Sequence, residues 1–263
     1  MKSNFQNLCT AILFSFAFMA STSSEAQRNE FYQLKTYSFD TDEQIATTDN
    51  YLENAYLPAL KRLGITQVGV FKYREIEGEE TQKKIIMLIP SPSLDVFKSL
   101  EYELSKDKTY LEAGKDYLKA TYDNPPYARI ESVFMEAFDD MPNMKPSPLR
   151  GSRKDRVYEL RSYESATEAI YRNKVHMFNE GGEVKLFEDL EFNAVFYADV
   201  ISGPKMPNLI YMTTHINQEV RDANWDLFRN APKWKEISSA PKYQNNVSHA
   251  DIMLLYPTEY SDY

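Results

Sequence analysis

One seven-residue phrase occurs twice in this 263-residue chain and constrains its fold more than any other feature. Residues 157–163 read Val-Tyr-Glu-Leu-Arg-Ser-Tyr, and residues 31–37 read Phe-Tyr-Gln-Leu-Lys-Thr-Tyr. In the two copies a cation, a Leu and two Tyr residues occupy equivalent positions. Side chains of a β-strand alternate between two faces, and both copies alternate in this way. We therefore predict two similar modules, each opening with a strand.

The segments that follow each copy repeat in the same order. In the first module the pattern predicts strands at 31–37, 65–73, 84–89 and 130–138, with helical regions at 42–63 and 93–122. In the second module it predicts strands at 157–163, 192–200, 208–215 and 250–256, with helical regions at 168–190 and around Trp225 and Trp234. Corresponding strands recur 120 to 127 residues later, which indicates duplication.

Each module has the order βαββαβ, the ferredoxin-like arrangement in which two helices cover one face of an antiparallel sheet. The other face would be an exposed apolar surface, so we expect the two modules to pack their open faces together. The predicted fold class is α+β, with tandem ferredoxin-like modules forming a pseudo-dimeric α/β barrel. The predicted domains are residues 27–138 and 156–263, joined by a Pro-rich linker at 139–155.

The first 26 residues resemble a cleavable export signal. Lys2 precedes an apolar run at residues 8–20, and the segment ends with the small-x-small pattern Ser24-Glu25-Ala26. The run has 13 positions, fewer than the ~20 that a membrane span requires. We expect cleavage after Ala26, a secreted or periplasmic mature protein, and no membrane anchor after cleavage.

Composition narrows the possible functions. The net charge of -9 argues against nucleic acid as a partner. Cys9, the single cysteine, lies in the predicted signal, so the mature protein has no disulfide and no thiol nucleophile. The sequence contains no Gly-rich phosphate loop, no His-Glu-x-x-His and no Gly-x-Ser-x-Gly motif. We predict no cofactor, leave the catalytic residues unknown, and regard a homo-oligomer as possible.

Glu159, Arg161 and Tyr163 form the most informative set because they share one face of a predicted strand. That strand is central in a ferredoxin-like sheet, and we expect this face to look into the cavity between the modules. Charged groups there must be paired. Either Arg161 and Tyr163 bind an anionic ligand, or Glu159 and Arg161 form a structural ion-pair network joining the halves, with Lys35 and Gln33 as partners.

The histidines do not suggest a metal centre. His215 ends a strand at the edge where the first strand of the module begins, far from His176 and His249. We therefore predict no metal site, although a smaller cluster of His176, His249 and Tyr163 remains open. The candidate ligand-binding residues are Glu159, Arg161, Tyr163, Lys35, Tyr37, His176 and His249.

The second module, residues 156–262, resembles a NIPSNAP domain. The resemblance is carried by residues 157–163, by Pro207-Asn-Leu-Ile-Tyr-Met, by Trp225-Asp-Leu-Phe, by Pro232-Lys-Trp and by Leu254-Leu-Tyr-Pro-Thr. The first module shares only the strand phrase and the element order. The resemblance implies a dimeric α/β-barrel architecture, which small-molecule monooxygenases share with binding proteins. Such a likeness does not assign a reaction.

Three functions are compatible with these observations. The leading hypothesis is that the cavity between the modules binds a small aromatic or anionic ligand without catalysis. The enzymatic alternative is a cofactor-poor monooxygenase or isomerase, which requires an open pocket reached by Tyr163 or a histidine. The third is a protein-partner-binding module, which predicts a filled barrel and an exposed apolar patch outside it.

Overall fold

The computed structural model describes residues 28–74 and 82–263. Within these ranges the chain forms eight strands: β1 Phe31–Ser38, β2 Gly69–Tyr73, β3 Lys84–Ser91, β4 Arg129–Ala137, β5 Val157–Glu164, β6 Ala194–Ser202, β7 Asn208–His215 and β8 His249–Pro257. The predicted signal, residues 1–26, lies outside the described residues.

The helices of the described residues follow the predicted order. They are α1 Asp42–Tyr51, α2 Leu57–Arg62, α3 Leu94–Leu104, α4 Lys108–Ala113, α5 Lys115–Leu118, α6 Glu168–Phe178, α7 Glu183–Asp189, α8 Gln218–Asn230 and α9 Pro232–Ser239, with a π-helix at Leu52–Tyr56 and a 3-10 helix at Pro241–Tyr243. Side chains of Thr41, Thr167 and Asn217 cap α1, α6 and α8. Among the described residues, no helix combines the length and the apolar composition needed to cross a bilayer.

Pro58 explains the π-helix between α1 and α2. Proline has no N–H to donate and its ring crowds the preceding turn, so a regular α-helix cannot continue through it unchanged. The chain widens by one residue instead, and the N–H of Leu57 donates to the carbonyl of Leu52. The helical region thereby continues to Arg62, and Gly64 follows it with a left-handed φ of +81°.

The strands form one closed antiparallel barrel in the order β1-β3-β2-β8-β5-β7-β6-β4. Each repeated phrase lies in a central strand, because β1 pairs with β3 and β4, and β5 pairs with β7 and β8. The two halves are joined where β2 pairs with β8 and where β4 pairs with β6. The predicted pseudo-dimeric α/β barrel is confirmed.

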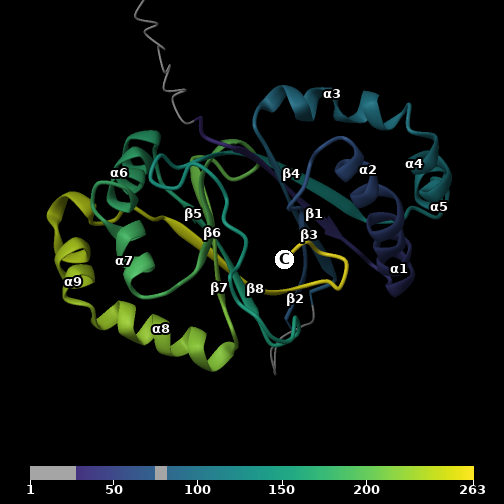
Figure 1. Ribbon diagram of the computed structural model, residues 1–263. Helices are drawn as coiled ribbons and strands as arrows, with labels where there is room; N and C mark the ends of the chain where they lie inside the picture. The colour runs from purple at the N-terminus through teal and green to yellow at the C-terminus, as the bar shows by residue number, and fades with distance from the viewer. Residues whose placement is uncertain (1–27, 75–81) are drawn as a thin grey trace, which may run out of the picture.

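Helices cover the barrel on two opposite sides (Figure 1), with α1 to α5 over the first half and α6 to α9 over the second. The core accordingly has an interior cluster built from both halves and an outer cluster beneath the helices of each half. Both faces of the barrel wall are therefore buried along the central strands.

Residues 139–155, predicted as a linker, contain no helix or strand, yet they pack on the barrel. The N–H of Met144 donates to the Glu30 carboxylate at 2.8 Å, and the Met144 side chain joins the interior cluster. Tyr263 packs beside it, with its hydroxyl 3.4 Å from the Met144 sulfur. These two side chains pack in the interior cluster near the starts of β1 and β5.

Candidate functional site

The central strand β5 turns its charged face toward the helices. Tyr158 and Leu160 belong to the interior cluster, whereas Glu159 accepts hydrogen bonds from α8. The prediction that Glu159, Arg161 and Tyr163 look into the cavity between the modules is therefore wrong. Closure of the barrel buries both faces of β5, and strand alternation separates these faces without saying which one lies inside.

Glu159 is the centre of a buried polar network in the second half. Its carboxylate accepts hydrogen bonds from Arg161 Nε at 2.7 Å, from Arg221 Nε at 2.8 Å and from Trp225 Nε1 at 2.7 Å. Arg221 and Trp225 reach it together because residues four apart lie on one face of a helix. The Arg161 guanidinium lies 3.7 Å from the centre of the Trp225 ring.

The charged groups of this network are hydrogen-bonded to one another, which is typical of a structural role. Burial of Glu159 opposes its ionisation, but the hydrogen bond from Arg221 and the charge of Arg161 outweigh burial and lower the pKa of the carboxyl. Arg161 also donates to the Tyr163 hydroxyl at 2.8 Å. The structural interpretation of Glu159 and Arg161 is supported, although their partners lie in one half and do not join the two.

The corresponding residues of β1, Lys35 and Tyr37, also face helices. Tyr37 is buried in the outer cluster of the first half, and the Lys35 ammonium lies 5.1 Å from the centre of the Tyr56 ring. Burial lowers the pKa of Lys35, while the nearby charge of Glu101 opposes that shift. Gln33, which replaces the glutamate of the second copy, donates to the Ser132 hydroxyl. Lys35 and Gln33 are thus not partners of the Glu159 network.

The open cluster of His176, His249 and Tyr163 is not formed. His176 Nδ1 lies 2.8 Å from the Tyr243 hydroxyl on the helical side of the sheet. His249 Nε2 lies 3.1 Å from Asp251 Oδ1 at the start of β8. The Tyr163 hydroxyl instead bonds Arg161 and lies 3.0 Å from that of Tyr211.

His215 gives the protein a predictable sensitivity to acid. Its side chain is buried at the end of β7, and burial lowers its pKa from 6.5 to about 4. The unfolded chain therefore takes up a proton near pH 6.5, whereas the folded protein does so only near pH 4. The contribution of neutral His215 to the free energy of unfolding is complete above pH 6.5. It declines on acidification and has fallen by about 2 kcal/mol at pH 5.

The test compares urea midpoints at pH 7.5 and pH 5 for the wild type and for His215→Gln. We expect the variant to lose most of the difference between the two pH values, and the exposed-residue control His249→Gln to keep it. Equal pH dependence in all three proteins would contradict the role of His215.

Apolar side chains fill most of the barrel interior. The Tyr32 and Phe196 ring centres lie 5.3 Å apart, and those of Phe71 and Tyr158 lie 5.0 Å apart. A pocket of about 80 Å³ remains at the opposite end from Met144, where β1 and β5 end. It is lined by Leu34, Thr36, Glu131, Val133, Leu160, Ser162, Val200, Pro204, Lys205, Asn208, Ile210, Asp251 and Met253. The predicted cavity between the modules is thus confined to this end, which we call the barrel mouth.

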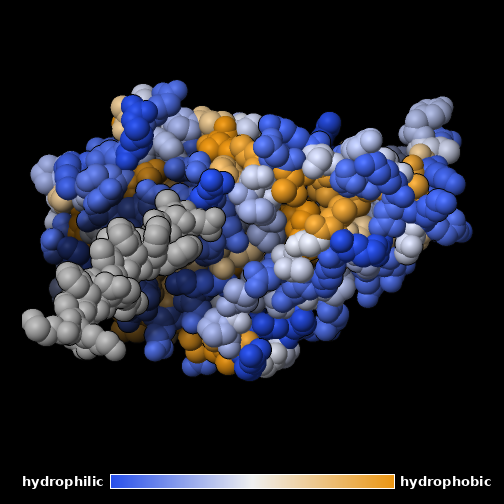
Figure 2. All heavy atoms as spheres, turned by 45° about the horizontal axis from the view of Figure 1, so that its top comes forward, coloured by the Kyte–Doolittle hydropathy of each residue, from blue (hydrophilic) through white to orange (hydrophobic). Residues whose placement is uncertain are grey.

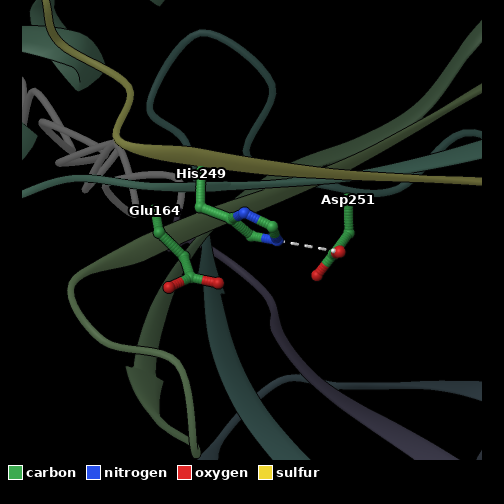
Figure 3. A group of neighbouring side chains, drawn as sticks. All are labelled: Glu164, His249 and Asp251. Carbon is green, nitrogen blue, oxygen red and sulfur yellow. Dashed lines mark hydrogen bonds and ion pairs between the residues drawn. The ribbon is translucent and has the colours of Figure 1, made fainter.

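Glu164 and His249 stand beside Asp251 at the barrel mouth. Figure 3 shows Glu164, His249 and Asp251 projecting to the same side of the strands, with the imidazole between the two carboxylates. One potential ligand atom of each lies within 4.8 Å of the others. Strand alternation explains this placement, since Glu164 continues the inward series of Leu160 and Ser162 in β5, and His249 and Asp251 precede Met253 in β8. Sequence reasoning missed Glu164 and Asp251, although the spacing of His249 and Asp251 already places both on one face.

Larger hollows lie elsewhere on the surface of the described residues. One of about 470 Å³ is lined in part by the cations Lys72, Arg74 and Lys83, and another, of about 730 Å³, lies around Tyr117 and Tyr122. Lys72 pairs with Asp49, Lys83 pairs with Asp42, and Arg74 donates to main-chain carbonyls. The barrel mouth is the better candidate site because it lies between the two halves and combines apolar side chains with polar ones.

The closed barrel of two ferredoxin-like halves places the chain in the dimeric α/β-barrel class of proteins, with one polypeptide supplying both halves. A proposed monooxygenase from Lactobacillus acidophilus NCFM has a similar fold, with a TM-score of 0.55 and 9% identity over 88% of this chain and 94% of that chain. An anthrone oxidase-like protein is similar with a TM-score of 0.52 and 10% identity over 89% of this chain and 92% of that chain. These likenesses establish the fold and not the reaction.

The NIPSNAP family model matches residues 158–262. A NIPSNAP family protein from Agrobacterium tumefaciens str. C58 aligns with 16% identity over 41% of this chain and 97% of that chain, at a TM-score of 0.37. No curated protein sequence gives a significant match. The second half of the chain is a NIPSNAP domain, and the resemblance predicted from its motifs is confirmed.

Proposed function

We propose that this protein binds a small ligand at the barrel mouth, between its two halves. The observation that carries the proposal is the pocket of about 80 Å³, which has an apolar floor and a polar rim and is lined by both halves. Leu160, Ile210 and Met253 supply apolar surface, while Asn208 and Lys205 supply hydrogen-bond donors. Binding sites commonly combine these two features.

The volume limits the ligand to a few non-hydrogen atoms. The pocket has room for several water molecules, since one water needs roughly 10 to 15 Å³ of such space. Pockets for drug-sized ligands are several times larger, at about 300 to 1,000 Å³. The best-fitting class is therefore a short-chain acid, alcohol or amine whose apolar part enters the pocket and whose polar end stays at the rim.

The enzymatic alternative is that the same pocket hosts a cofactor-poor oxygenation or isomerisation. It is supported by the fold shared with the proposed monooxygenase. This alternative requires Tyr163 or a histidine to reach the pocket. Tyr163 does not, because it faces the helices and accepts a hydrogen bond from Arg161. His249 at the barrel mouth remains as a titratable group for this alternative.

The partner-binding alternative is supported by the packed barrel interior and by an apolar hollow outside it. Leu94 and Phe97 of α3 line this hollow together with Phe134 and Ile201. The face drawn in Figure 2 is mostly hydrophilic and carries a few separate hydrophobic patches. The barrel mouth is preferred because it combines apolar surface with oriented polar groups.

A thermal-shift screen of short-chain acids, alcohols and amines tests the proposal. A ligand at about 100 times its Kd should stabilise the protein by about 2.7 kcal/mol, which raises the melting temperature by roughly 5 to 10 °C. Thr36→Phe should abolish the shift by filling the pocket, whereas the exposed-site control Thr109→Phe should retain it. Absence of any shift across the screen, or an equal shift in Thr36→Phe, would refute binding at the barrel mouth.

A further inference from the structure

We propose that Glu164, His249 and Asp251 form a binding site for a divalent transition-metal ion at the barrel mouth. The proposal deepens the function proposed above, because the ion would stand beside the same pocket, but the binding of the ion does not depend on that function. The three residues supply one imidazole nitrogen and two carboxylates, each with a potential ligand atom within 4.8 Å of the others.

Strand pairing assembles the three side chains. Glu164 is the last residue of β5 and pairs directly with His249, the first residue of β8. Asp251 is two residues further along β8, so it shares the face of His249. The main chain fixes the strand ends, since the N–H of Ser248 donates to the Glu164 carbonyl at 2.8 Å. In a tetrahedral site the ligand atoms lie roughly 3.4 Å apart, so the three side chains would draw closer together around an ion.

The charges at the barrel mouth favour a cation. Asp251 and Glu131 line the pocket, and Lys205 is the one cation among its described lining residues. Lys205 forms a salt bridge with Asp251. The site thus already holds an ammonium ion with an ionised carboxylate. A divalent ion would displace Lys205 and gain two further ligands that Lys205 does not use.

The ligand set narrows the class of metal. Carboxylates alone suit Mg²⁺ and Ca²⁺, while an imidazole shifts preference toward Zn²⁺ and neighbouring transition ions. His249 is 59% exposed and Asp251 is 30% exposed, so the remaining coordination positions are accessible to a ligand. An ion there would hold an oxygen atom of a ligand whose apolar part lies in the pocket.

Isothermal titration of the EDTA-stripped, dialysed protein with ZnCl₂ tests the site. We expect one saturable site per chain, weakened at least about tenfold in His249→Ala, the loss that even an outer-shell partner can cause. His176→Ala is the matched control, since His176 bonds Tyr243 away from the barrel mouth, and it should leave Zn²⁺ affinity unchanged. Lys205→Met should strengthen binding several-fold by removing the competing cation.

The outcomes separate the two proposals. Absence of a saturable site, unchanged affinity in His249→Ala, or equal losses in His176→Ala and His249→Ala would overturn the metal site. Thr36→Phe should keep Zn²⁺ binding while it blocks the pocket. Zn²⁺ binding without any ligand-induced thermal shift would support the metal site and refute the proposed function.

Discussion

Replacement of Glu159 by alanine is expected to destabilise the protein by about 3 to 5 kcal/mol, the range observed when one partner of a buried ion pair is removed. Glu159 is fully buried, and its carboxylate is the acceptor for Arg161, Arg221 and the Trp225 N–H. Without it, two guanidinium groups of like charge remain close together in the outer cluster. The measurement is the free energy of unfolding from urea or guanidinium titrations.

Two variants make the result specific. Glu159→Gln keeps the shape and one acceptor oxygen but loses the charge, so we expect a smaller loss than for alanine. Glu188→Ala removes a glutamate that is 69% exposed and paired with Lys185, and it should change stability by less than about 0.5 kcal/mol. A loss below about 1 kcal/mol in Glu159→Ala would show that the network does not hold α8 on the sheet.

The same network adds to acid sensitivity. Because the folded pKa of Glu159 lies below the ordinary value of 4.5, its stabilising contribution is present above that pH and is lost as the pH falls through the folded pKa. Glu159→Gln should therefore show a weaker decline of stability below pH 4.5 than the wild type.

The overall topology could be predicted because duplication supplied long-range information that a single copy lacks. The phrase at 157–163 alone indicates a strand, but its second copy at 31–37 identifies two equivalent modules. Each copy proves to be a central strand with two full-length partners. The βαββαβ order then leaves the open sheet faces to cover each other, and the closed barrel follows.

The orientation of the central strand could not be predicted in the same way. Alternation separates Tyr158 and Leu160 from Glu159 and Arg161, but both faces of the strand are buried. The deciding contacts come from α8, where Arg221 and Trp225 meet Glu159. Their spacing of four residues was visible in the sequence, but the placement of that helix over β5 depends on tertiary packing.

The barrel mouth was only partly visible in the sequence. His249 and Asp251 alternate on one strand, and Glu164 continues the parity of Ser162. The pairing of Glu164 with His249, however, joins residues 85 positions apart and is set by the register of β5 against β8. Local patterns cannot fix such a register, so the three side chains could be related only once the sheet was known.

Replacement of Phe71 by alanine is expected to destabilise the protein by about 3 to 5 kcal/mol and to open an apolar cavity inside the barrel. The ring is fully buried and packs against Tyr158 and Tyr263, with ring centres 5.0 and 5.6 Å away. The packing is tight, since a Cβ atom placed on Gly69 would lie 2.5 Å from the Phe71 ring. Guanidinium titration measures the loss, and Tyr122→Ala, which removes an aromatic ring that is 98% exposed, is the control.

Benzene distinguishes a filled barrel from one that is merely closed. An engineered cavity lined by apolar side chains stays dry and binds benzene, so benzene should raise the melting temperature of Phe71→Ala while leaving the wild type unchanged. Equal stabilisation of both proteins would mean that the wild-type interior already has room for a ring. In that case the ligand site would extend from the barrel mouth into the interior. The ligand would then no longer be limited to a few non-hydrogen atoms. A benzene response confined to Phe71→Ala would instead restrict any native ligand to the barrel mouth, because the aromatic packing around Phe71 blocks the path inward.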